Sequence, residues 1–200
     1  MNLSHIRKDA ACYITSPLVK VLSKSKVTPN ILTLGNLGLS IIAAYVIATG
    51  KLLVGGILVL VSGLFDILDG ALARSTGQGT NFGAVLDSTV DRIAEAATLG
   101  GVLFWYLFQD NNLGVALSFA VAVGSLLVSY VRARAEGIGQ QCQVGWFTRA
   151  ERVVVLAIGL ILNQILIALC LLLVFVFLTV FQRMAHVRKQ AKTRGAKWVS

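Results

Sequence analysis

Residues 66–91 read DILDGALARSTGQGTNFGAVLDSTVD. Asp66 and Asp69 end one apolar run, and Asp87 and Asp91 begin the next. Intervals of three and four residues place each pair on a single face of a helix. Four carboxylates in apolar surroundings repel one another and lose hydration, and a divalent cation is the simplest counter-charge. The segment therefore predicts two facing helices with a metal site between them.

The rest of the chain has the composition of an integral membrane protein. Of its 200 residues, 56% are hydrophobic and only 14% are charged, which is unusual for a soluble domain. A membrane span needs roughly 20 mostly apolar residues. That window predicts six spans, near 31–49, 52–68, 84–106, 113–132, 147–162 and 165–182. The last two share one long apolar run, which we expect to be broken by a tight hairpin at Asn163 and Gln164.

Positive charge gathers at both ends of the chain. The basic residues there are Arg7, Lys8, Lys20, Lys24 and Lys26, and then Arg183, Arg188, Lys189, Lys192, Arg194 and Lys197. Because cytoplasmic segments collect Lys and Arg, we expect both termini and the aspartates on the cytoplasmic side of the cell membrane. Loop charge agrees, since the joint between spans three and four carries no basic residue while the next joint carries four arginines.

The chain divides by composition into three parts. Apolar residues recur at helical intervals between Ile6 and Leu22 with basic residues elsewhere on the wheel, which predicts an amphipathic surface helix within 1–27. Residues 28–183 are expected to form one all-α domain of six transmembrane helices. Residues 184–200 are a basic cytoplasmic tail suited to anionic lipid, and nucleic acid is not an expected partner.

The residues between the aspartates favour phosphoryl transfer. Gly70 and Gly83 lack a β-carbon and allow a backbone or a ligand to approach closely. Carboxylates suit Mg²⁺, with Mn²⁺ as the alternative, and Arg74 can pair with a phosphate. A salt-bridged structural cluster and a cation pathway are the competing interpretations, but the acids outnumber nearby arginines, and a cation pathway explains neither Arg74 nor the glycines.

The pattern Asp-x2-Asp-Gly-x2-Ala-Arg-x8-Gly-x3-Asp-x3-Asp, complete here, resembles the CDP-alcohol phosphotransferase family. The resemblance implies a membrane enzyme, usually a homodimer, that moves a phosphoalcohol from a CDP-activated donor to a hydroxyl and releases CMP. It implies that Asp66, Asp69 and Asp87 hold metal and that Asp91 binds a second metal and accepts the proton. The implied CDP-lipid contacts are Asn30, Ile31, Leu32, Thr33, Gly70, Ala73, Arg74, Thr80 and Gly83.

Arginines near the fourth and fifth spans bear on the acceptor alcohol. Their planar guanidinium groups grip phosphate bidentately, which favours a phosphorylated acceptor. Ser129 to Glu136, the pair Glu151 and Arg152, and Arg183 resemble the inositol phosphate pocket of phosphatidylinositol phosphate synthases in that family. The resemblance implies that Arg132, Arg134, Arg152 and Arg183 bind the acceptor phosphate. The competing interpretation is topological, because inner loops collect positive charge, and Arg149 is the residue most open to it.

We therefore expect CDP-diacylglycerol and inositol 1-phosphate as substrates, with phosphatidylinositol phosphate and CMP as products. Phosphatidylglycerophosphate synthesis remains an alternative because glycerol 3-phosphate also brings a phosphate. An archaeal-type ether-lipid donor, giving archaetidylinositol phosphate, is a further alternative, since apolar helices do not distinguish acyl from isoprenoid chains. Outside the enzymes, a metal-ion transporter or a membrane scaffold remains.

Overall fold

The computed structural model describes residues 28–77, 79–142, 144–145 and 147–193. These residues form six α-helices and no strand. The helices are α2 (Pro29–Ala48), α3 (Leu52–Thr76), α4 (Asn81–Phe108), α5 (Asn112–Gly137), α6 (Arg149–Ile161) and α7 (Ile165–Thr193). Each of the six expected spans coincides with one helix, which confirms the all-α class. The expected amphipathic segment, 1–27, lies outside the described residues.

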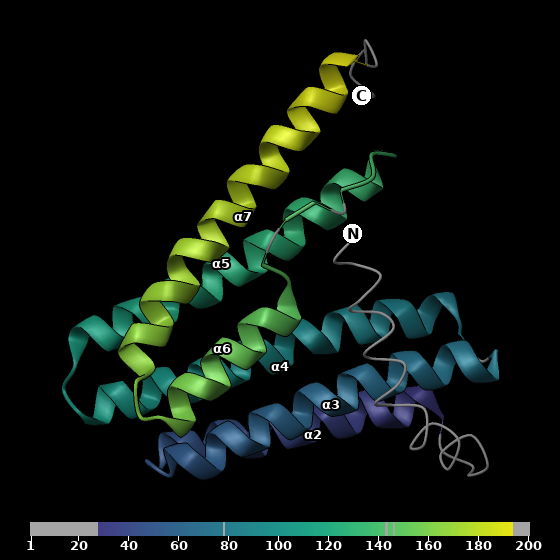
Figure 1. The fold of residues 1–200 in the computed structure, drawn as a ribbon. Helices are drawn as coiled ribbons and strands as arrows, with labels where there is room; N and C mark the ends of the chain where they lie inside the picture. The colour runs from purple at the N-terminus through teal and green to yellow at the C-terminus, as the bar shows by residue number, and fades with distance from the viewer. Residues whose placement is uncertain (1–27, 78, 143, 146, 194–200) are drawn as a thin grey trace.

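The helices pack into a bundle around the aspartate segment. In Figure 1, α2 lies along α3 and α4, α5 lies along α7, and the short α6 runs between α3 and α7. A β-carbon at Gly101 on α4 would lie 2.4 Å from the carbonyl oxygen of Ala44 on α2. These two backbones therefore touch, as small residues permit between membrane helices. Fully buried Ile47, Val102 and Leu160 fill the core behind the site.

Four helices, α2, α3, α5 and α7, are long and apolar enough to cross a membrane. Helix α4 carries Asp87, Asp91, Arg92 and Glu95, which lowers its hydropathy, and the part after Glu95 is mostly apolar. Helix α6 has 13 residues and is about 20 Å long at 1.5 Å per residue, less than the roughly 30 Å of a hydrocarbon core. The structure thus supports a helical membrane protein with four candidate spans.

The hairpin between α6 and α7 lies where the sequence predicts it. Asn163 adopts a left-handed backbone conformation with φ of 53°, and the N–H of Gln164 donates to the carbonyl of Gly159 at 2.7 Å. These two polar residues stop α6 and reverse the chain. Helix α7 then continues past the expected end at 182 to Thr193, through the basic residues Arg188 and Lys189.

Candidate active site

Three of the predicted metal ligands lie together at the facing ends of α3 and α4. Asp66, Asp69 and Asp87 each offer a carboxylate oxygen, and these oxygens lie within 4.8 Å of one another. The Oδ1 atom of Asp87 is buried and receives no hydrogen bond from any described residue. Converging carboxylates with a buried oxygen in need of a partner fit a hard divalent cation. The group therefore has the donor set that the sequence predicts.

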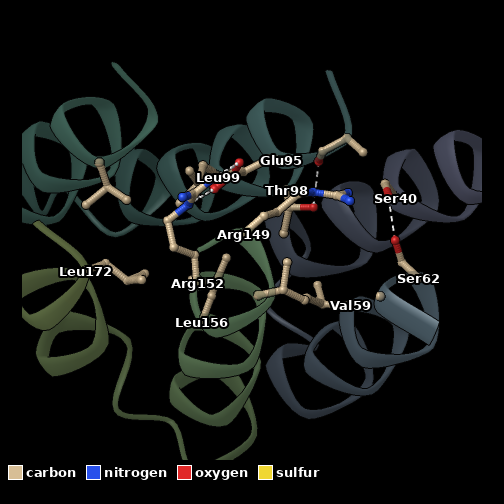
Figure 2. A pocket seen from close by; sticks show the side chains of 14 residues that line it. Ser40, Val59, Ser62, Glu95, Thr98, Leu99, Arg149, Arg152, Leu156 and Leu172 are labelled. Atoms are coloured by element: carbon tan, nitrogen blue, oxygen red, sulfur yellow. Dashed lines mark hydrogen bonds and ion pairs between the residues drawn. The ribbon is translucent and has the colours of Figure 1, made fainter. Parts of the chain in front are cut away.

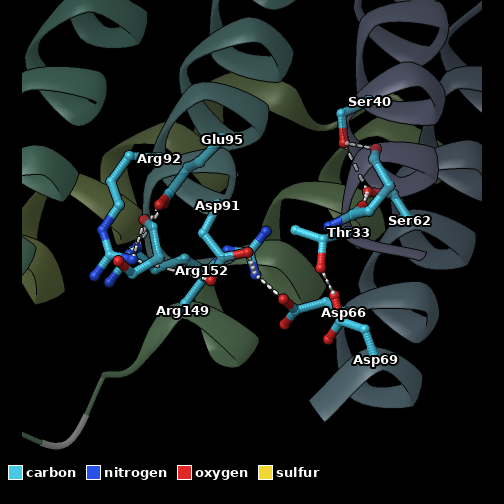
Figure 3. A network of polar contacts seen from close by, with 12 residues as sticks. Thr33, Ser40, Ser62, Asp66, Asp69, Asp91, Arg92, Glu95, Arg149 and Arg152 are labelled. Carbon is cyan, nitrogen blue, oxygen red and sulfur yellow. Dashed lines mark hydrogen bonds and ion pairs between the residues drawn. The ribbon is translucent and has the colours of Figure 1, made fainter. Parts of the chain in front are cut away.

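A row of polar side chains between α2 and α3 positions Asp69. Thr33 Oγ1 donates to Asp69 Oδ2 at 2.8 Å, as Figure 3 shows. Further along α2, buried Asn36 accepts from the hydroxyl of Ser62, which lies 2.7 Å from the hydroxyl of Ser40. Hydrogen bonds between membrane helices fix their register. These hydrogen bonds thus hold the part of α3 that carries Asp69 against α2.

Arg149 bridges the fourth aspartate, Asp91, to Asp66. Its Nη1 atom lies 2.6 Å from Asp66 Oδ1 and 2.7 Å from Asp91 Oδ1, and Figure 3 places the guanidinium between the two carboxylates. Arg149 was the arginine most open to a purely topological interpretation. That interpretation is wrong for its position, because the side chain reaches into the centre of the site. Its spacing from the aspartates along the chain gives no signal of this contact.

A cavity of about 190 Å³ adjoins the cluster on the side of α2, and we call it the glycine-lined cavity. Its lining residues are Pro29, Asn30, Thr33, Asp69, Gly70, Ala73, Arg74, Gly79, Thr80, Gly83, Ala84 and Asp87. A β-carbon at Gly83 would lie 3.0 Å from Thr80 Oγ1 and 3.2 Å from Asn30 Oδ1, so a side chain there would crowd the cavity. Of the predicted CDP-lipid contacts, exposed Ile31 and buried Leu32 are not among the lining residues.

A larger cavity of about 460 Å³ lies on the other side of the cluster, and we call it the arginine-lined cavity. Its charged lining residues are Asp87, Asp91, Arg92, Glu95, Arg132, Glu136, Arg149, Arg152 and Arg183. The structure thus brings Arg132, Arg152 and Arg183 together as predicted. Arg134 is exposed and is not among the lining residues.

Each arginine of this cavity has its own anchor. Arg183 donates from Nε to the carbonyl of Val144 at 3.0 Å and from Nη1 to the carbonyl of Val128. Arg132 pairs with Glu136 one turn away at 2.8 Å. Arg152 pairs at 2.6 Å with Glu95, a residue that belongs to none of the motifs in the sequence. Side chains from α4, α5, α6 and α7 therefore form one charged wall, in which five arginines stand among four carboxylates.

The start of α6 aims Arg149 and Arg152 into the site. Thr148 and Glu151 form a capping box that fixes the first turn. Arg149 and Arg152 are three residues apart and share a face. Beneath them lies a small pocket of about 30 Å³. Its lining includes Val59, Leu99 and Leu156, which Figure 2 labels. This mostly apolar floor closes the site toward the interior of the bundle.

The comparisons with known proteins agree with this geometry. Residues 26–185 match the CDP-alcohol phosphatidyltransferase family. The chain belongs to this family. It is 35% identical to the phosphatidylinositol phosphate synthase of Mycobacteroides abscessus, over 92% of this chain and 87% of that one. Identity is 41% to the Corynebacterium glutamicum enzyme of the same name, over 78% and 72%, and 33% to the archaetidylinositol phosphate synthase of Pyrococcus horikoshii, over 86% and 89%.

Solved structures of one relative share the fold. The Mycobacterium tuberculosis phosphatidylinositol phosphate synthase with CDP-DAG bound matches with a TM-score of 0.79 at 35% identity, covering 88% of this chain and 94% of that one. The same enzyme in complex with manganese and citrate also gives 0.79, at 34% identity over 86% and 88%. The chain is thus a transferase of phospholipid biosynthesis, and its aspartate cluster has the ligands that a divalent metal needs.

Proposed function

We propose that this chain is a phosphatidylinositol phosphate synthase, which transfers the phosphatidyl group of CDP-diacylglycerol to inositol 1-phosphate and releases CMP. The observation that carries the proposal is the pair of unlike cavities that share Asp87. One is small and lined by glycines and Arg74, and the other is wide and lined by arginines. An enzyme that joins a nucleotide-activated lipid to an anionic alcohol needs one cavity of each kind.

The glycine-lined cavity is the proposed donor site. Gly70 and Gly83 leave room for the CDP group beside the aspartates, while Asn30, Thr80 and Arg74 supply hydrogen-bond donors around it. Ala73 and Thr33 complete the wall. For Ile31 and Leu32, which lie off this cavity, we propose contact with the lipid part of the donor. The relative solved with CDP-DAG bound supports a CDP-lipid in a fold of this kind.

The arginine-lined cavity is the proposed acceptor site, with Arg132, Arg152 and Arg183 around the phosphate. Asp91 faces this cavity and takes the proton of the attacking inositol hydroxyl. The hydroxyl oxygen forms a bond to the lipid-side phosphorus, and the bond from that phosphorus to the CMP oxygen breaks. Arg149 places a positive charge between Asp66 and Asp91, where negative charge builds on the transferring group.

Asp66, Asp69 and Asp87 are the proposed ligands of Mg²⁺, with Mn²⁺ as an alternative, and Asp91 is the proposed ligand of a second ion. A divalent metal at these carboxylates supplies charge neutralisation for the phosphates and the leaving CMP. The manganese complex of the Mycobacterium tuberculosis enzyme supports a divalent ion in this family. The cluster oxygens are close enough to share one ion.

We further propose that all six helices cross the cytoplasmic membrane as one domain, 28–183, with both termini and the active site facing the cytoplasm. The short α6 would cross where the bilayer thins locally around it. The basic ends of the chain and the arginines near Arg132 and Arg149 support this orientation. The segments 1–27 and 184–200 are proposed to lie on the inner membrane surface. A homodimer is proposed as the assembly, as in the family that the motif resembles.

An archaeal-type donor is the second candidate, favoured by the similarity to the Pyrococcus horikoshii enzyme. It changes the lipid chains and leaves the acceptor and the chemistry in place. The site geometry described above is the same for both donors, because the chains extend beyond the phosphates. Only a comparison of the two CDP-lipid donors as substrates therefore distinguishes the two candidates.

The testing experiment is CMP release by the purified protein with Mg²⁺ and CDP-diacylglycerol. Inositol 1-phosphate, free inositol, glycerol 3-phosphate and serine are compared as acceptors, and EDTA serves as the metal-free control. We expect release with inositol 1-phosphate and none with free inositol or after chelation. Release with glycerol 3-phosphate in its place would reassign the acceptor, and release only from a CDP-activated isoprenoid ether lipid would reassign the donor. No release with any acceptor or donor would favour a transport or scaffold role.

A further inference from the structure

Glu95 and Arg152 form a buried ion pair that ties α4 to α6. The Nε and Nη2 groups of Arg152 donate to the two carboxylate oxygens of Glu95 at 2.6 and 2.9 Å, as Figure 3 shows. The Arg152 side chain is only 4% exposed and that of Glu95 11%. Two parallel charge-assisted hydrogen bonds fix the plane of a guanidinium. Burial makes the pairing obligatory, because either partner alone would be an uncompensated charge.

The pair leaves one edge of the guanidinium turned away from Glu95. Since Glu95 engages Nε and Nη2, the Nη1 group of Arg152 projects from the opposite edge, and both residues line the arginine-lined cavity. Arg132 and Glu136 also pair on this cavity, but each side chain is 47% exposed. An exposed pair holds its geometry weakly. Arg152 on Glu95, like Arg149 on Asp91, is thus an arginine of this wall whose direction a largely buried carboxylate imposes.

Glu95 also stands in a fixed relation to Asp91. The two residues are four apart on α4, so they lie one turn from each other on the same face, about 6 Å along the axis. A phosphorylated alcohol that reacts here must be held at its phosphate while its hydroxyl faces Asp91. Helix α4 can fix both ends of such a molecule, the hydroxyl through Asp91 and the phosphate through Arg152.

We propose that Glu95 is a positioning residue that holds Arg152 in register with Asp91 and thereby sets the phosphate-to-hydroxyl distance of the acceptor. The role rests on the proposed function, because it requires a phosphorylated acceptor. Glu95 contacts no reacting atom in this scheme and acts through Arg152. Charge alone predicts the opposite effect, since a carboxylate beside an anion site repels phosphate and its removal should tighten binding.

The test is a double-mutant cycle read by KM for each substrate in the CMP-release assay. We expect Glu95→Gln to raise the acceptor KM about tenfold, because a tenfold change corresponds to the loss of one charge-assisted hydrogen bond. The donor KM should change less than twofold. The double variant with Arg152→Ala should bind acceptor no worse than Arg152→Ala alone. Glu95→Asp keeps the charge but shortens the side chain, and its acceptor KM should lie between wild type and Glu95→Gln.

Asp110→Asn is the control, because it removes one negative charge at an exposed position that lines neither cavity. Asn tolerates the left-handed backbone conformation of this residue, and we expect the acceptor KM of the variant to change less than twofold. A lower acceptor KM in Glu95→Gln, or additive effects in the cycle, would overturn the positioning role. So would a loss of kcat with unchanged KM and a lowered Tm, which is the signature of a structural pair. If Glu95→Gln does not fold, Glu95→Asp carries the same readout.

Failure of this role is distinguishable from failure of the proposed function. Wild-type turnover with free alcohols alone would refute the phosphorylated acceptor and, with it, the reason for Glu95. Wild-type turnover with inositol 1-phosphate or glycerol 3-phosphate, without coupling between Glu95 and Arg152, would refute the role of Glu95 alone. In the second case the cycle is measured with whichever phosphorylated acceptor the enzyme uses.

Discussion

The two cavities that meet at Asp87 are built on different principles. The glycine-lined cavity is narrow, comes from α2, α3 and α4, and owes its space to missing side chains at Gly70, Gly79 and Gly83. The arginine-lined cavity is more than twice as large and comes from four helices and the loop before α6. Its arginines are held by carboxylates and backbone carbonyls. The glycine-lined cavity is thus defined by its shape, and the arginine-lined cavity by arginines whose side chains are held in place.

The difference predicts separable effects of substitution. Filling space in the first cavity should act on the CDP-lipid, whereas releasing an anchored arginine in the second should act on the acceptor. Asp91, which lines the arginine-lined cavity and contacts Arg149, lies where the two substrates must meet. Substitution there should act on the chemical step itself.

The largest effect is expected for Asp91→Asn. An amide cannot accept the proton of the attacking hydroxyl, so kcat should fall at least a thousandfold. Binding of CDP-diacylglycerol should persist, because Asp91 does not line the glycine-lined cavity. CMP release under saturating substrates gives kcat, and equilibrium binding of the donor in detergent gives its affinity.

Substantial residual turnover in Asp91→Asn would remove Asp91 as the base. Loss of donor binding would instead indicate that Asp91 shapes the donor side, and the two cavities would then not be separable at this residue.

Arg152→Ala should give the next largest effect and should act on the acceptor side alone. Removing a buried, charge-assisted phosphate contact should raise the acceptor KM about thirtyfold or more, with the donor KM changed less than threefold. Steady-state kinetics with each substrate varied in turn measures the split. Equal increases in both KM values would contradict the assignment of one cavity to the donor and the other to the acceptor. The melting temperature is the control, since Glu95 loses its partner in this variant.

Much of this fold could be predicted from hydrophobic periodicity and turn residues. The apolar runs located every described helix, and Asn163 with Gln164 marked the reversal between α6 and α7. Periodicity could not show that the helix of the last span continues through Arg188 and Lys189, because charged residues end a membrane span without ending a helix. The hydrophobic pattern shows which residues are apolar, and it does not show where a helix ends.

The two sides of the site were unequally predictable. Apart from Pro29, Asn30 and Thr33 on α2, the residues of the glycine-lined cavity lie within one spaced motif, so the sequence already groups Asp69, Gly70 and Gly83. The contacts of the arginine-lined cavity join residues far apart in the chain, such as Glu95 with Arg152, 57 positions away. Tertiary packing decides those pairs, and neither spacing nor residue type reveals them. No sequence pattern therefore indicates a role in the site for Arg149 or Glu95.

Gly83→Ala tests the shape side of the comparison and should have a moderate effect. The new β-carbon would crowd Thr80 and Asn30 at 3.0 and 3.2 Å, so the donor KM should rise about fivefold to tenfold while the acceptor KM stays within twofold. Gly100→Ala on the same helix is the matched control, because its β-carbon meets no atom within 4 Å. An unchanged donor KM in Gly83→Ala would mean that the CDP group lies elsewhere.

The smallest effect is expected for Arg134→Ala, which tests whether an exposed arginine next to the charged wall contributes to acceptor binding. The sequence places Arg134 beside Arg132 in the expected phosphate-binding segment, but its side chain is exposed and does not line the arginine-lined cavity. An exposed charge near an anion site contributes mainly through solvent, where salt screens it. The acceptor KM should therefore rise about twofold at low ionic strength. This difference from wild type should shrink in about 0.5 M salt, where the Debye length falls to roughly 4 Å. Arg152→Ala, by contrast, should keep most of its effect in salt because its guanidinium is buried. A salt-independent, tenfold rise for Arg134→Ala would show that this residue reaches the phosphate after a rearrangement of α5.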